Sequence, residues 1–175
     1  MFQGWDNYFM LVGAASGGLI GLLFVVVTLT ANFERERAMR GSAIYLTPTM
    51  IQFALALTTS AIVVAPLAGP LAASLIAGGG AVGLGYAVRT AIGILGLSKA
   101  ADPPHWSDLW CYAALPAAAY LGLEAAVAGL FAHAPWAPGA LAALLLAALL
   151  LAIRNAWDLI TWMAPRGGRG NPRSL

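Results

Sequence analysis

Five long segments of the chain are almost free of charged side chains. They cover about residues 8–33, 48–64, 71–97, 109–131 and 139–162, and stretches rich in proline, glycine or charge separate them. A membrane-spanning α-helix needs about 20 predominantly apolar residues, and each segment is near or above that length. The pattern therefore predicts an all-α protein, a polytopic transmembrane bundle of about five helices.

The composition agrees with this prediction. Apolar residues make up 61% of the 175 positions and charged residues only 9%, whereas soluble domains average about 45–50% and about 25%. So few charges could not cover the surface of a water-soluble domain of this size. We expect a single transmembrane domain over residues 1–175, with a cytosolic tail at 163–175.

Among the connections between the predicted helices, only alternate ones contain lysine or arginine. The cations of these connections and of the tail are Arg35, Arg37, Arg40, Lys99, Arg166, Arg169 and Arg173. Cytoplasmic loops carry an excess of positive charge. We therefore expect a bacterial inner-membrane protein with its N-terminus outside and its C-terminus in the cytosol.

Small residues recur on one face of the first predicted helix. Gly13, Gly17 and Gly21 occur at every fourth position, and Gly79 and Gly83 repeat the spacing in the third helix. A flat face of this kind admits a neighbouring backbone at close range. It either packs within one bundle or joins copies of the chain, and the sequence leaves both readings open.

Polar side chains follow one line along each of two predicted helices. In the fourth helix the line has a spacing of four and holds Asp108, Tyr112, Pro116, Tyr120 and Glu124. In the second helix it holds Thr49, Gln52, Thr59 and Ser60. Because a polar group that faces lipid is costly, both lines should face the bundle interior or a subunit interface. They provide either interhelical hydrogen bonds or a hydrated, proton-relaying path.

Glu124 differs from the other polar residues of its line. It lies in the predicted outer half of the membrane, at a depth that no lysine or arginine shares. Carboxyl groups within a membrane are candidates for function. This intramembrane carboxyl either donates a hydrogen bond across helices or carries protons.

Seven polar residues from three predicted helices are expected to meet in the cytosolic third of the membrane. They are Thr49, Gln52, Tyr86, Arg89, Arg154, Asn155 and Asp158. At about 1.5 Å per residue, both arginines lie about 12 Å from the cytosolic ends of their helices. Two arginines beside one carboxylate leave a positive surplus, which suits a small anion or a lipid phosphate. Alternatively each arginine reaches the headgroups or pairs internally, Arg154 with Asp158.

Several segments resemble a family of small bacterial membrane proteins with five predicted spans and no assigned activity. The similar positions are residues 17–25, Thr47, Pro48, Thr49, Phe53, Pro66, Gly85, Tyr86, Pro116, Tyr120 and, above all, residues 155–158. In that family a histidine often stands where this chain has Gln52 and Arg154. Because this chain has an amide and a guanidinium group in place of these two imidazoles, the resemblance argues against a metal-binding role. The resemblance implies membership and topology, and no activity.

The chemistry that remains is that of binding. We expect a non-enzymatic protein that binds a small anion or a lipid headgroup. The alternatives are a homo-oligomeric channel or permease, formed through the first helix, and an accessory subunit of a larger membrane complex. An enzyme is a further alternative, for which Asp108, Glu124 and Asp158 are the available acids and bases. No intramembrane lysine or paired histidine indicates a cofactor or metal, and nothing indicates nucleic acid.

Overall fold

The computed structural model describes residues 2–30, 46–97 and 105–163, and every regular element in these ranges is helical. The first three spans are α1 (Asp6–Thr30), α3 (Thr47–Val64) and α4 (Gly69–Leu97). The fourth consists of α5 (Trp106–Leu109), the π-helical turn η2 (Trp110–Ala114) and α6 (Leu115–Phe131), and the fifth is α7 (Ala137–Met163). All five spans are long and apolar enough to cross a membrane, which confirms the predicted all-α multi-pass bundle.

The helix ends lie close to the predicted ones. The largest difference is at the fourth span, which begins at Trp106 and not at residue 109. Residues 31–33 of the predicted first helix and residues 164–175 of the predicted tail lie outside the described part of the chain, and Met163 belongs to α7. The π-helical turn was not predicted.

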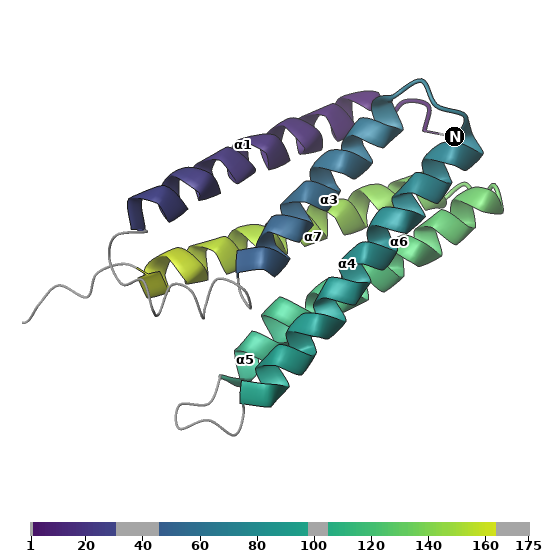
Figure 1. The fold of residues 1–175 in the computed structure, drawn as a ribbon. Helices are drawn as coiled ribbons and strands as arrows, with labels where there is room; N and C mark the ends of the chain where they lie inside the picture. Colours follow the sequence, from purple (N-terminus) through teal and green to yellow (C-terminus); the bar gives the residue numbers. More distant parts are fainter. Residues whose placement is uncertain (1, 31–45, 98–104, 164–175) are drawn as a thin grey trace, which may run out of the picture.

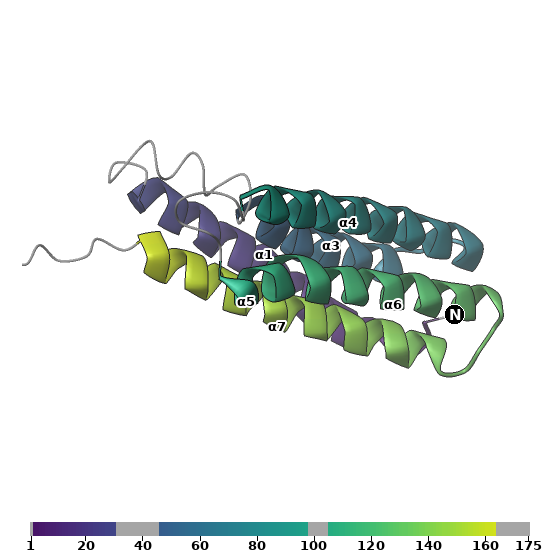
Figure 2. The same ribbon diagram turned by 90° about the horizontal axis from the view of Figure 1, so that it is seen from below.

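Four of the helices form a ring in which each packs against two others, in the order α3, α4, α6, α7 and back to α3. Helix α1 lies outside this four-helix ring, against α3 and α7. The spans run side by side with alternating direction (Figures 1 and 2). Helices α3 and α6 are therefore diagonal to each other across the ring, and so are α4 and α7.

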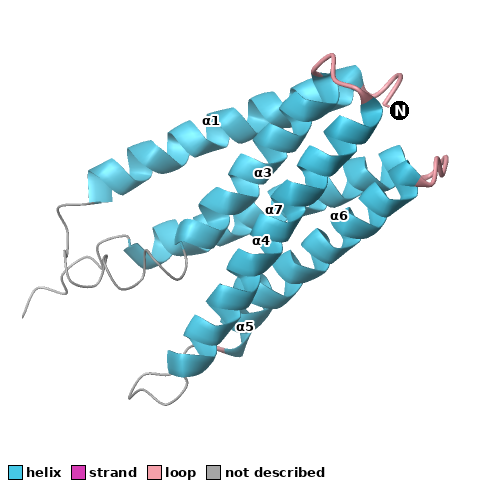
Figure 3. Cartoon of the chain, turned by 45° about the vertical axis from the view of Figure 1, so that its right-hand side comes forward, coloured by secondary structure: helices cyan, strands magenta, loops and turns pink. Residues whose placement is uncertain are grey.

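The two ends of the bundle differ. The loops that join α3 to α4 and α6 to α7 lie at the end that holds the N-terminus (Figure 3). At the opposite end α4 and α7 finish and α3 and α5 begin. Arg89 and Arg154 are in this second half of α4 and α7, so we name it the arginine end.

Aromatic residues fix α1 at the N-terminal end. The rings of Trp5 and Tyr8 meet edge to face at 5.7 Å, and Tyr8 meets Phe9 at 5.4 Å. The Tyr8 hydroxyl donates to the carbonyl of Ala142 in α7 at 2.8 Å. Amphipathic Trp and Tyr rings are typical of membrane interfaces. From this anchor, α1 diverges from α3 toward the arginine end (Figures 1 and 3).

The glycines of α4 allow close packing inside the bundle. A Cβ atom at Gly79 or Gly83 would lie 2.9 Å or 2.7 Å from the side chain of Leu55 in α3. At Gly83 it would also lie 2.7 Å from the ring of Tyr120 in α6. The close-packing reading of the glycine spacing in α4 is thus correct.

The glycines of α1 behave differently. Gly13 packs against Ser60, where a Cβ atom would come within 3.0 Å of the serine Cβ. At Gly17, Gly18 and Gly21 no atom of the described residues lies within 4 Å of that position. Only 22% of the apolar stretch of α1 is buried, against 33% to 44% in the other four spans. Most of the glycine face of α1 therefore points out of the bundle.

A pair of substitutions in α4 tests this packing. Gly83→Ala should lower the free energy of unfolding by about 1–3 kcal/mol, because the added methyl group overpacks the contact with Leu55 and Tyr120. Gly85→Ala is the matched control, because its Cβ meets nothing within 4 Å and alanine favours the helix. Thermal unfolding in mild detergent measures both, and equal shifts for the two variants would contradict the packing.

Candidate functional site at the arginine end

The helix that contains Pro116 changes its hydrogen-bond register just before that residue. In η2 the N–H of Leu115 donates to the carbonyl of Trp110, five residues earlier, whereas an α-helix uses the carbonyl four residues earlier. The next donor in the π register would be residue 116, and proline has no N–H. The carbonyl of Cys111 is thus left without that backbone donor.

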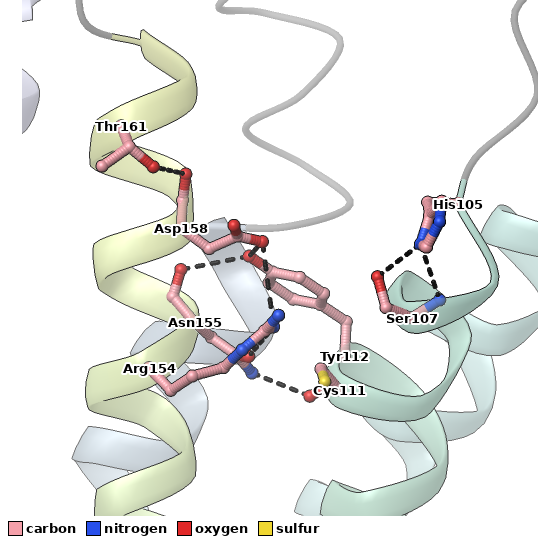
Figure 4. A network of polar contacts seen from close by, with 8 residues as sticks. All are labelled: His105, Ser107, Cys111, Tyr112, Arg154, Asn155, Asp158 and Thr161. Carbon is pink, nitrogen blue, oxygen red and sulfur yellow. Dashed lines mark hydrogen bonds and ion pairs between the residues drawn. The ribbon is translucent and has the colours of Figure 1, made fainter.

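Asn155 of α7 supplies the missing donor. Its Nδ2 donates to the Cys111 carbonyl at 2.8 Å, and the side chain is fully buried. In return the Tyr112 hydroxyl donates to the main-chain carbonyl of Asn155 at 3.0 Å (Figure 4). Two side chains and two backbone carbonyls form a reciprocal clasp between η2 and α7. We name it the Asn155–Tyr112 clasp.

Arg154 and Asp158 complete the outer side of this clasp. Nη1 of Arg154 donates to Oδ1 of Asn155 at 3.2 Å and lies 3.8 Å from Oδ2 of Asp158 (Figure 4). The two charged side chains are 45% and 49% exposed, so their ion pair contributes little stability by itself. Because Arg154 occupies the amide oxygen, the amide nitrogen is oriented toward Cys111. The internal pairing that the sequence left open is present.

The charges of Arg154 and Asp158, on the outer side of the clasp, cancel. One guanidinium stands beside one carboxylate, and Oδ2 of Asp158 also accepts a long hydrogen bond of 3.4 Å from the Tyr112 hydroxyl. The expected positive surplus is therefore not located at this group. Among the described residues, the remaining cation of the arginine end is Arg89.

Arg89 and Tyr86 are not joined to the clasp. They lie on α4, which is diagonal to α7 in the ring. Both are exposed, whereas Ala87 and Thr90 beside them are buried. Arg89 has neither a hydrogen bond nor an ion pair with any residue in the described ranges. The predicted ligand-binding role of the seven residues stays a prediction. Among the described residues, no hydrogen bond or ion pair joins Gln52, Tyr86 or Arg89 to the clasp.

The polar line of α3 faces the bundle interior, as expected. All four of its members, Thr49, Gln52, Thr59 and Ser60, are at most 2% exposed. No hydrogen bond joins Gln52 to the clasp, and neither its amide oxygen nor its amide nitrogen has a partner among the described residues. In the line of the fourth span, Tyr112, Pro116 and Tyr120 are buried, and the two carboxylates at its ends are half-buried.

Glu124 lies between α6 and α4. Its Oε1 and the side chain of Leu123 occupy the space where a Cβ atom of Gly80 would be. This oxygen is buried and has no hydrogen-bond partner in the described part of the chain. The absence of a side chain at Gly80 is what admits the carboxyl group. Whether Glu124 carries protons stays a prediction.

Hydrogen bonding is the chemistry that the described side chains offer at this end. Within residues 2–30, 46–97 and 105–163, no three His, Cys, Asp or Glu side chains gather as metal ligands. Nδ1 of His105 accepts from the backbone N–H of Ser107 at 3.3 Å and caps the start of α5 (Figure 4). Cys111 is a free thiol.

Sequence reasoning missed the clasp because it placed Tyr112 in a line of polar residues and Asn155 in a ligand group. The signal was Pro116 inside an apolar helix. A proline there removes one backbone donor and disturbs the helix before it. That signal locates the disturbed turn, but it does not identify the side chain that satisfies the freed carbonyl.

Asn155→Leu tests the clasp. It should lower the free energy of unfolding by about 1–2 kcal/mol, because the Cys111 carbonyl loses its donor in an apolar setting. In the background of Pro116→Ala the same change should cost less, because the new N–H of residue 116 can serve that carbonyl. Thermal unfolding of the two single variants and the double variant measures this coupling. Equal costs in both backgrounds would show that Pro116 does not create the need for Asn155.

Comparison of the chain with models of known families, with curated proteins and with solved structures gives no match. The resemblance to a family with five predicted spans therefore stays a prediction. What can be concluded about this protein rests on its own residues: it is an all-α, multi-pass membrane bundle in which a π-helical turn is clasped to the last span.

Proposed function

We propose that this protein is a non-catalytic, multi-pass protein of a bacterial inner membrane that binds the phosphate group of an anionic lipid at its arginine end. The observation that carries the proposal is the environment of Arg89. Its side chain is exposed on the outer face of a spanning helix, without an acceptor among the described residues. A guanidinium group in that position needs an acceptor beyond the described residues, and a lipid phosphate can provide it.

The depth of Arg89 supports a headgroup as that acceptor. It lies eight residues before the end of α4 at Leu97, which corresponds to about 12 Å along the helix axis. A long arginine side chain can extend its charged end toward the interface while its apolar stem stays in the hydrocarbon region. The guanidinium group forms paired hydrogen bonds with phosphate oxygens.

The outward direction favours a lipid over a free anion. Tyr86 is 37% exposed and stands one helical turn from Arg89, so the two side chains are neighbours on the surface of α4. An aromatic ring beside a cation is typical of the membrane interface. The predicted orientation, with the arginine end in the cytosol, would direct this pair to the leaflet that carries anionic lipids.

Arg89→Gln should weaken the binding of phosphatidylglycerol about tenfold, the loss expected when a charge-assisted hydrogen bond worth about 1.5 kcal/mol is removed. The rise in thermal midpoint on titration with phosphatidylglycerol in detergent measures the affinity. Phosphatidylcholine, which carries no net charge, is the control lipid.

Arg154→Gln is the matched control variant, because Arg154 already has Asn155 and Asp158 as partners. It should lower the thermal midpoint without lipid and leave the affinity for phosphatidylglycerol unchanged. An equal loss of affinity in both variants would contradict a site at Arg89. Displacement of the lipid by inorganic phosphate would identify the ligand as a free anion instead.

A second candidate function is assembly into a homo-oligomer through α1. The observation that favours it is the open glycine face of α1. A Cβ atom at Gly17, Gly18 or Gly21 would have no atom of a described residue within 4 Å. Among the described residues, these glycines have no neighbour that requires a flat helix face. Glycine faces of this kind allow two transmembrane helices to approach closely. A homo-oligomeric channel or permease and an accessory subunit would both use such a face.

Gly17→Leu tests this candidate. Because its Cβ position is open, the variant should fold as a monomer and should dissociate an oligomer that uses this face. Ala15→Leu is the control, since Ala15 is exposed on α1 two positions away, about 200° around the helix. Mass measurement in mild detergent reports assembly. An unchanged mass of an oligomer in Gly17→Leu would exclude the face, and a monomeric parent protein would exclude self-assembly.

A further inference from the structure

Gln52 is a buried primary amide without a partner. The residue is 1% exposed, and neither Oε1 nor Nε2 has a hydrogen bond in the described part of the chain. Phe53 and Ala56, which share the buried side of α3, are apolar and 1% exposed. Transfer of an amide into an apolar environment without a hydrogen bond is costly, so native proteins almost always provide a partner.

A second polar group lies at the same level of the four-helix ring. Tyr120 is 4% exposed on α6, and its hydroxyl has no hydrogen bond to a described residue. Its ring and the side chain of Leu55 both lie against Gly83, since a Cβ atom there would be 2.8 Å from Cζ of Tyr120 and 2.7 Å from Leu55. Cζ carries the hydroxyl group, so this group is also close to Gly83.

Gln52 precedes Leu55 by three residues, about one helical turn. Helical side chains lean toward the N-terminus of their own helix, and both α3 and α6 have their N-termini toward the arginine end. Gln52 and Tyr120 thus extend in the same direction from neighbouring levels. They stand on diagonal helices of the ring. Because Gly83 has no side chain, Leu55 of α3 and the ring of Tyr120 come close together beside it.

We propose that Gln52 and Tyr120 hold a buried water molecule between α3 and α6. A buried water makes about three hydrogen bonds to groups that would otherwise be unsatisfied. The amide oxygen of Gln52 accepts, its amide nitrogen donates and the hydroxyl group of Tyr120 can do either. These three groups provide that number of hydrogen bonds. All three groups are uncharged, so the site suits a neutral molecule and not a cation or an anion. This inference is independent of the lipid site at Arg89.

The alternative is a dry centre with two orphaned polar groups. The two cases differ in the sign of a stability change. Replacing an unpartnered polar group by an apolar one of similar shape is neutral or stabilising. Replacing one that binds water leaves the water and the remaining polar group with fewer partners, which is destabilising.

The experiment is a double-mutant cycle of Gln52→Met and Tyr120→Phe, followed by thermal unfolding in detergent. Each single variant should lower the thermal midpoint by at least about 2 °C. The midpoint of the double variant should fall by less than the sum of the two single shifts, because the same water is lost only once. Gln3→Met, at an exposed glutamine, is the control for the first change. Tyr8→Phe, which loses the direct bond to Ala142, should not couple to Gln52→Met.

Unchanged or raised midpoints in the single variants would overturn the proposal, and so would strictly additive losses. If Gln52→Met fails to fold, the sign of the shift in Tyr120→Phe decides alone, because that change removes one oxygen atom. Radiolytic hydroxyl labelling is a second measurement, since radicals formed at a buried water oxidise the nearest side chains. Tyr120 should be labelled in the parent protein and less so in Gln52→Met, and an unlabelled Tyr120 in the parent would exclude the water.

Discussion

Every polar group of the backbone needs a partner inside a membrane, and one residue of the fourth span breaks that rule. Pro116 cannot donate to the carbonyl of Cys111 in the π register, so the carbonyl has to find a donor on another helix. Asn155 provides it at 2.8 Å. The position of α7 against η2 follows from this need, and the return bond from Tyr112 fixes it from the other side. Arg154 and Asp158 keep the amide in its orientation.

The two arginines of the arginine end illustrate how packing decides the role of a charge. Arg154 has an amide and a carboxylate on its own helix and is therefore part of the clasp. Arg89 lies eight residues before the end of α4, close to the nine of Arg154 in α7, but α4 turns it away from the bundle. One guanidinium is satisfied by residues of its own helix, and the other has no acceptor in the described part of the chain. The two arginines therefore differ in their neighbouring side chains and not in their depth along the helices.

The same contrast holds for the glycines. In α4 the missing side chains at Gly79, Gly80 and Gly83 admit groups of α3 and α6, so close packing uses them within one chain. In α1 the helix is anchored by Tyr8 and then diverges, so that Gly13 packs and Gly17 does not. Identical spacing in the sequence therefore produces an internal contact in one helix and an outward face in another.

From the sequence we could predict the number of spans, their limits to within a few residues and the burial of the polar line on α3. These properties follow from local hydrophobicity and from the cost of exposing polar groups to lipid, both of which act along one helix. The partners of Asn155, the placement of Arg89 outside the clasp and the approach of Leu55 and Tyr120 at Gly83 follow from the tertiary structure. They depend on which helices are adjacent or diagonal in the ring and on the rotation of each about its axis. The sequence gives the depth of a residue along its helix, but it gives neither the neighbours of that helix nor its rotation.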